Sequence, residues 1–204
     1  MGCCKSCLHI DGAQFNSLNL TRVSSSFTQD EIIQLGTFLS EIPDHCQEAI
    51  INLPVRQLLT FYQYHLMALY HGLQREWLFA ISYEQCLIKG LRALMPTEKD
   101  HYIFCNFYGV LSASFLALGE IHTAIEGIQI ALAILLKHTL NDHKKISYHY
   151  YHLANAYKRI KHCKEAAECF VKAIEIARLS NEIDEEYVDM LETDLRTINS
   201  SNIK

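Results

Sequence analysis

The sequence contains little proline or glycine, with 3 prolines and 8 glycines among 204 residues. Half of the residues are hydrophobic and a fifth are charged. This composition excludes collagen-like, low-complexity and wholly disordered chains, and it provides enough apolar material for a sizeable core. The chain also lacks a basic surplus, because 18 Lys and Arg stand against 23 Asp and Glu, a formal charge of −5. Since nucleic-acid binders neutralise phosphates with cations, we expect no nucleic-acid partner.

The sequence shows no signal peptide, and its eight cysteines are too dispersed for a small disulfide scaffold. We therefore expect free thiols in a reducing compartment. Two stretches of eighteen residues lack charge, Gln57 to Gln74 and Tyr102 to Gly119. Eighteen residues is about the minimum for a membrane span. Because polar side chains interrupt both stretches, we expect helices wedged between neighbouring helices rather than membrane spans.

Motifs for catalysis and cofactor binding are absent from the sequence. It has no Gly-x-Ser-x-Gly, no Walker-type loop and no dinucleotide glycine pattern, so we expect a non-enzyme without a cofactor. Cys4 and Cys7 have zinc-ligand spacing and His9 is close, but no second Cys-x-x-Cys completes the set. His149 and His152 share a helical face without a carboxylate at ligand spacing. We therefore expect no metal site.

The chain reads as helices with short breaks. Residues 1–26 show no apolar periodicity and are expected to form a flexible tail. Order is expected to begin with a capping box of Thr28 and Glu31. Pro43 ends this helix, and Asp44 is expected to cap the next one. No run alternates with period two for long enough to demand a strand.

Two later stretches repeat one pattern without gaps. The matching positions are Tyr108, Leu111, Ser112, Phe115, Gly119, Ala124, Ile128 and Ala131, and then Tyr150, Leu153, Ala154, Tyr157, Lys161, Ala166, Phe170 and Ala173. Each stretch predicts two helices joined by a tight turn. Ala124 and Ala166 are expected to be buried where the second helix crosses the first closely. A generic helical bundle is the alternative, but two gapless copies favour a repeat array.

This pattern resembles the tetratricopeptide repeat (TPR) family, in the longer-period form of the kinesin light chain. The resemblance implies an all-α solenoid of antiparallel helix pairs. We expect an array over 27–180, with repeats near 61–94, 105–138 and 147–180, and a capping helix within 181–204. The first repeat departs from the family pattern at His71, Arg75 and Glu84. Lys161 replaces the turn glycine of the last repeat, at little cost only if that turn avoids positive φ.

The resemblance also implies a groove lined by the first helix of each repeat. In the last repeat the carried-over peptide-binding positions are Tyr148, Tyr151, Asn155, Lys158 and Arg159. In the middle repeat they are Asn106, Gly109, Ala113, Leu116 and Ala117. Such a groove suits a peptide with hydrophobic anchors and a carboxylate or phosphate. The alternative is that the two tyrosines pack against the tail or the capping helix.

The C-terminal segment is acidic. Its carboxylates are Glu182, Asp184, Glu185, Glu186, Asp189, Glu192 and Asp194. Asn181 and Asp184 stand at capping-box spacing, and an apolar face follows with Val188, Leu191, Leu195 and Ile198. The acidic side chains form either a solvated outer face or an interaction surface.

The N-terminus carries a lipidation pattern. Gly2 and Ser6 match the N-myristoylation motif. One myristoyl chain binds membranes weakly, and Cys3, Cys4 and Cys7 can accept palmitate as the second signal. The pattern predicts a protein held at the cytosolic face of a membrane, whereas the alternative is an unmodified tail.

Together these features predict a non-enzymatic adaptor that binds a partner peptide and is tethered to membranes. Two other functions fit a helical array: a peptide-sensing regulator, and an accessory helical domain of a larger enzyme system. The lipidation pattern disfavours a bacterial peptide sensor, because this modification is eukaryotic.

Overall fold

The structure, a computed structural model, describes residues 28–40 and 42–201. The chain forms two compact units, residues 1–63 and 64–204, and the boundary between them falls within one helix, α4. The helices of the described residues are α2 (Gln29–Ser40), α3 (Asp44–Ile51), α4 (Val55–Leu73), α5 (Trp77–Leu94), α6 (Ile103–Leu118), α7 (Ile121–His138), α8 (His143–Arg159), α9 (Cys163–Ala177) and α10 (Glu185–Ser201). The described residues contain no strand, as the sequence predicts.

In the first unit, α2 begins directly after Thr28. Pro43 precedes α3, and Asp44 is the first residue of this helix rather than the residue that caps it. The Gln47 side chain donates to Asp44 Oδ1 at 3.1 Å. The core of the unit consists of Leu35, Phe38, Leu39, Ile42, Cys46, Ile50, Leu58 and Leu59.

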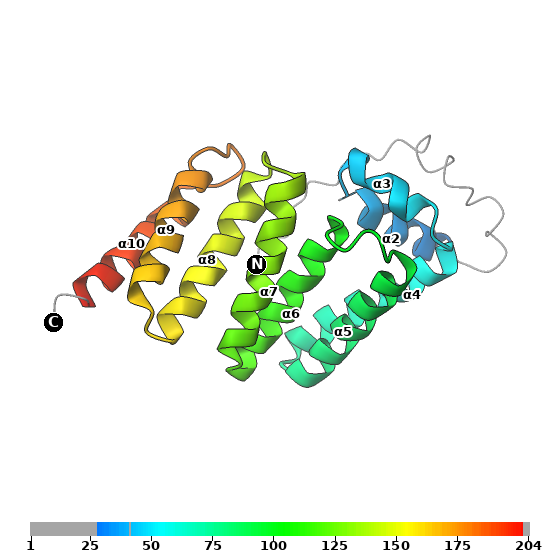
Figure 1. The fold of residues 1–204 in the computed structure, drawn as a ribbon, viewed down its shortest axis with the longest axis horizontal. Helices are drawn as coiled ribbons and strands as arrows, with labels where there is room; N and C mark the ends of the chain where they lie inside the picture. Colours follow the sequence, from blue (N-terminus) through cyan, green and yellow to red (C-terminus); the bar gives the residue numbers. More distant parts are fainter. Residues whose placement is uncertain (1–27, 41, 202–204) are drawn as a thin grey trace. The chain divides into compact units, whose positions relative to one another are not determined.

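In the second unit, α5 to α10 lie side by side in chain order, each packed against the next (Figure 1). This arrangement confirms the predicted all-α, TPR-like stack of antiparallel helix pairs. The five described cysteines are free thiols. Among the described residues, no helix combines the length and the apolar character that crossing a membrane requires.

Small residues lie at the helix crossings of the second unit. Ala124 and Ala166 are fully buried, as predicted. Gly127 is equally constrained, because a Cβ atom there would overlap the Ser112 hydroxyl. That hydroxyl donates to the Tyr108 carbonyl at 2.6 Å. Close approach of α6 and α7 therefore needs both a glycine and a small polar residue.

The three helix pairs share one turn geometry. In each turn a backbone N–H donates to the carbonyl five residues earlier: Glu76 to His71, Glu120 to Phe115 and His162 to Tyr157. The residue before each donor is left-handed, with φ of 61° at Arg75, 87° at Gly119 and 62° at Lys161. This is the C-terminal motif in which glycine is favoured, because it has no Cβ. Lys161 could replace the turn glycine at little cost only if the turn avoided positive φ, and its φ is positive.

The first helix pair replaces an apolar contact with a buried hydrogen bond between a carboxyl group and a histidine. Glu84 occupies the phenylalanine position of the pattern and is completely buried. Its Oε1 lies 2.6 Å from Nδ1 of His65 on α4, whose ring packs edge-on against Phe107 at 5.1 Å. Burial raises the pKa of Glu84, and the hydrogen bond and charge of His65 oppose that rise. Glu84, the polar residue at this apolar position of the repeat, therefore has a hydrogen-bonding partner, His65, on the other helix of the pair.

The C-terminal helix α10 packs on α9. Asp184, and not Asn181, caps this helix, because its Oδ1 accepts from the Tyr187 N–H at 2.9 Å. Val188, Leu191 and Ile198 are buried, as expected for a capping helix.

Candidate peptide-binding surface

The aromatic pair of the expected groove is in contact with α10. Tyr148 packs edge-on against Tyr187 of α10, with ring centroids 4.8 Å apart. Tyr151 lies 6.1 Å from the same ring and 6.2 Å from Phe170 of α9. The contacts match the alternative in which these tyrosines pack against the capping helix. Tyr148 still exposes 36% of its surface.

The polar positions of α8 also have partners within the chain. Lys158 Nζ lies 3.0 Å from Asp194 Oδ1 on α10. Arg159 donates to the carbonyl of Leu116, one of the positions expected in the middle repeat. Asn155 donates to the Tyr151 carbonyl at 3.1 Å, within its own helix. The hydrogen bond of Arg159 therefore connects the expected groove positions of α8 and α6. The side-chain amide of Asn155 is bonded within α8.

The middle-repeat positions form a small-residue surface on α6. Ala113 and Ala117 are exposed, whereas Asn106 is half-buried. Gly109 lies against His149 of α8, since a Cβ atom added there would be 3.4 Å from Nε2 of that ring. A Cβ atom at this position would therefore make an ordinary van der Waals contact with the histidine of the next repeat.

Sequence reasoning offered the capping helix as a neighbour of the two tyrosines, but it did not identify Tyr187 or Asp194 as the contacting residues. Tyr187 sits between Tyr148 and Tyr151, and its hydroxyl lies 3.4 Å from the Ser147 hydroxyl. Burial raises the pKa of Tyr187 to about 12, so the ring stays neutral. Tyr187 and Asp194 are seven residues apart, or two helical turns, as are Tyr151 and Lys158 on α8, and this shared spacing is the signal that could have paired the two helices.

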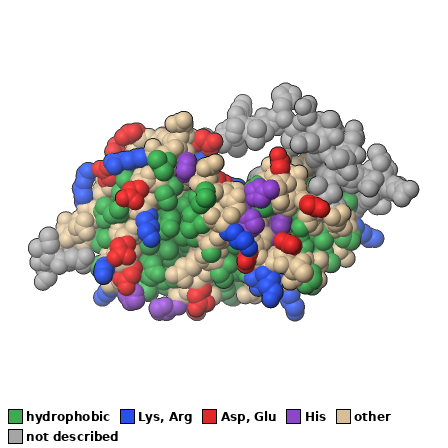
Figure 2. Space-filling view, turned by 45° about the horizontal axis from the view of Figure 1, so that its top comes forward, with side chains coloured by type: hydrophobic (Ala, Val, Ile, Leu, Met, Phe, Trp, Pro, Cys, Tyr) green, Lys and Arg blue, Asp and Glu red, His purple; other side chains and the backbone are tan. Residues whose placement is uncertain are grey.

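The charges near the C-terminal end are of both signs. Figure 2 shows acidic and basic side chains next to one another over the last helices of the second unit. Glu192 accepts from Arg178, the residue after α9, at 2.6 Å and from Arg196 at 2.8 Å. Two carboxylates of α10, Glu192 and Asp194, are therefore paired with basic side chains.

A second polar cluster lies where α6 meets the start of α8. Lys145 Nζ donates to the Tyr102 hydroxyl at 2.7 Å and lies 3.8 Å from Asp142. Burial raises the pKa of Tyr102 to about 12. Burial, the largest single contribution, lowers the pKa of Lys145, but the hydrogen bond to Tyr102 and the charge interactions with Tyr102 and Asp142 together outweigh it, and the pKa of Lys145 is raised. Both groups therefore keep their protons near neutral pH, and the cluster fixes the α7–α8 connection to α6.

Two histidines of α8, His149 and His152, favour their uncharged forms. Burial lowers the pKa of His149, and it also lowers the pKa of His152. His149 Nδ1 bonds to the Lys145 carbonyl at 2.8 Å. The protein environment thus favours uncharged imidazoles here.

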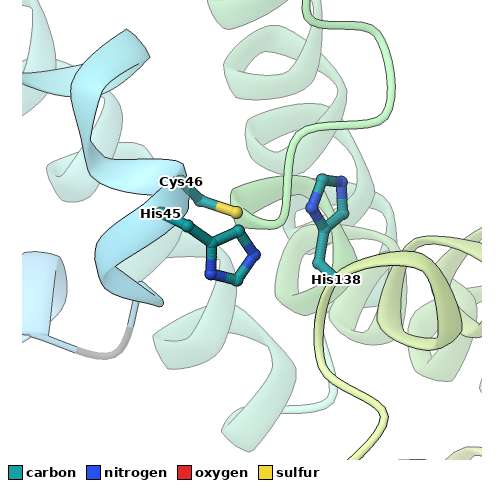
Figure 3. A group of neighbouring side chains, drawn as sticks. All are labelled: His45, Cys46 and His138. Carbon is teal, nitrogen blue, oxygen red and sulfur yellow. The ribbon is translucent and has the colours of Figure 1, made fainter.

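Other residues of metal-ligating type are drawn in Figure 3. His45 and Cys46 come from α3, and His138 comes from the last turn of α7. Helix α3 belongs to the first unit and α7 to the second, so we assign no metal site to them. The predicted acylation residues Gly2, Cys3, Cys4 and Cys7, and the Cys-x-x-Cys pair among them, lie outside the described residues.

Comparison with known proteins shows the fold. No family model and no curated protein matches the sequence. A solved structure, described as a kinesin light chain from Podosopora anserina with nearly identical TPR-like repeats, matches with a TM-score of 0.58 and 18% identity. The match covers 69% of this chain, which spans 65% of that one. The chain therefore has the helical-repeat fold of TPR-like proteins.

Proposed function

We propose that this protein is a non-enzymatic scaffold that binds an acidic peptide with an aromatic anchor on the α6–α8 surface. One observation carries the proposal. Tyr148 of α8 packs against the Tyr187 ring of α10, and Lys158 of α8 pairs with the Asp194 carboxylate of α10. These internal contacts support a surface chemistry that accepts an aromatic anchor and a negative charge two helical turns apart.

The partner contacts the exposed parts of Tyr148, Tyr151, Asn155, Lys158 and Arg159. The exposed alanines of α6 form the adjoining apolar floor. The TPR-like fold supports a protein or peptide partner, since solenoids present extended surfaces to such ligands.

The experiment is a fluorescence-anisotropy titration of the full chain with acidic peptides that carry one aromatic residue. Lys158→Glu combined with Arg159→Glu should weaken binding about tenfold or more, because two cations are replaced by anions. The matched control is Lys164→Glu with Lys172→Glu on α9, where both lysines are exposed. Unchanged affinity in the α8 variant would place the partner elsewhere, with the acidic face of α10 as the next candidate.

The second part of the proposal concerns location. Residues 1–26 form an acylated tail in which Gly2 carries myristate and Cys3, Cys4 and Cys7 accept palmitate. The tail holds the scaffold at the cytosolic face of a membrane. The support is the sequence motif, because one acyl chain needs the second signal that neighbouring cysteines provide.

A further inference from the structure

Exposed hydrophobic side chains are concentrated at the start of the second unit. Among the described residues, sixteen large hydrophobic side chains are exposed, and seven of them lie between positions 66 and 79. These seven, which we call the α4–α5 apolar face, are Leu66, Met67, Leu69, Tyr70, Leu73, Leu78 and Phe79. Leu73, Leu78 and Phe79 expose 84%, 72% and 59% of their surface.

Ring contacts connect the α4 part of the face to α5. Leu66, Leu69, Tyr70 and Leu73 follow the spacing of three, four and seven residues that places side chains on one side of a helix. The Tyr70 ring lies 5.4 Å from His71, and the Phe79 ring lies 5.3 Å from the same histidine. These ring contacts therefore link Tyr70 of the α4 stripe to Phe79 of α5 through His71.

The size of the face is that of a protein interface. The exposed fractions correspond to roughly 700 Å², somewhat more than the largest apolar patch of a typical monomer. A standard-size interface buries about 800 Å² on each partner. Two such faces therefore supply enough area for a stable dimer.

The absence of charge on α4 favours a second copy of the chain as the partner. No Asp, Glu, Lys or Arg occurs from Gln57 to Gln74, so the α4 part of the face is uncharged. Near a two-fold axis each side chain lies close to its own copy, and a charged residue there would face a like charge. A lipid-binding helix face, in contrast, normally carries several Lys or Arg beside its apolar residues, whereas Arg75 at the turn is the one Lys or Arg between positions 57 and 79. At the turn, Glu76 lies 2.6 Å from His71 and is thereby paired within the chain.

We propose that the α4–α5 apolar face is where two copies of this chain associate as a symmetric dimer. Helix α4 packs against α4 of the second copy through the Leu66–Leu73 stripe, and Leu78 and Phe79 extend the contact. Each copy covers the other's unpartnered helix face, as a neighbouring repeat does inside an array.

The test is sedimentation equilibrium of the purified, unacylated full chain over a range of concentrations. The wild type should show a monomer–dimer equilibrium. Leu69→Glu with Leu73→Glu should raise its dissociation constant at least about tenfold, because four carboxylates would meet across the axis. Both leucines are exposed, so thermal melts of the variant should match those of the wild type.

Leu140→Glu with Leu179→Glu is the matched control, because these leucines are 69% and 65% exposed and lie outside the face. This control should leave the dimer intact. A wild type that stays monomeric at about 100 μM, or equal weakening by both double variants, would overturn the proposal. A further experiment measures binding of the protein to vesicles of neutral phosphatidylcholine. If the wild type binds these vesicles and the Leu69→Glu, Leu73→Glu variant does not, the face binds lipid. That result would also overturn the proposal.

Discussion

At the scale of single residues, the helix-pair turns carry conformational strain. Gly119 adopts its left-handed conformation freely, whereas Arg75 and Lys161 hold the same conformation with a Cβ atom. A Cβ in this region meets the neighbouring carbonyl oxygen. Two of the three turns therefore keep the backbone geometry of the pattern at the expense of stability.

Replacing Lys161 with glycine should stabilise the protein. Relief of the left-handed strain is partly offset by the greater freedom of glycine in the unfolded chain, so the gain is about 1 kcal/mol. Urea denaturation measures it. Lys161→Ala is the control and should give no gain, because alanine keeps the Cβ. Equal effects of the two substitutions would show that side-chain removal, not backbone strain, is responsible.

The fully buried Ala166 gives a second residue-scale prediction. Ala166→Phe should overpack the crossing of α8 and α9 and lower the free energy of unfolding by about 1–3 kcal/mol. Ala133→Phe on the exposed side of α7 is the matched control. If both variants melt like the wild type, the close helix crossing at Ala166 is wrong.

At the scale of elements, the α4–α5 pair contains the buried carboxyl group of Glu84, which makes its stability pH-dependent. Since the pKa of Glu84 in the folded protein is above its ordinary value of 4.5, its neutral form is favoured by folding. The resulting stabilisation is complete below the ordinary pKa and is lost as pH rises through the raised value.

Glu84→Gln removes this titration while it keeps a hydrogen-bonding group near His65. The melting temperature of the variant, relative to wild type, should therefore rise between about pH 5 and about pH 8. Glu98→Gln at an exposed position serves as the control and should show no such trend. A difference that falls with pH would mean that the ion pair with His65 outweighs the burial of Glu84.

At the scale of the whole molecule, the proposed tether and the repeat array are separable. Gly2→Ala should move the protein from membrane to soluble fractions, because both acylations depend on the first one. Cys3→Ser with Cys4→Ser should leave weak, reversible binding by one chain. Fractionation of cells that express each variant gives the measurement. Membrane association that survives Gly2→Ala would remove the proposed anchor.

The repeat pattern was sufficient to predict the helix pairs and their buried alanines. Ala124 and Ala166 are predictable because close helix packing leaves no room for a larger side chain, wherever the helices lie in the chain. The caps were harder to place. Asn181 and Asp184 both suit a helix start, and only the observed bond from the Tyr187 N–H distinguishes them.

Periodic spacing by itself thus determined the all-α class and the repeated helix–turn–helix unit, because local periodicity fixes which side of a helix is buried. Tertiary structure alone decided what the α8 side chains contact. Lys158 and Asp194 are 36 residues apart in the sequence, so the local sequence around either residue does not predict their contact. It also decided that Lys161 is left-handed and that Glu84 pairs with His65, since both depend on how neighbouring helices pack.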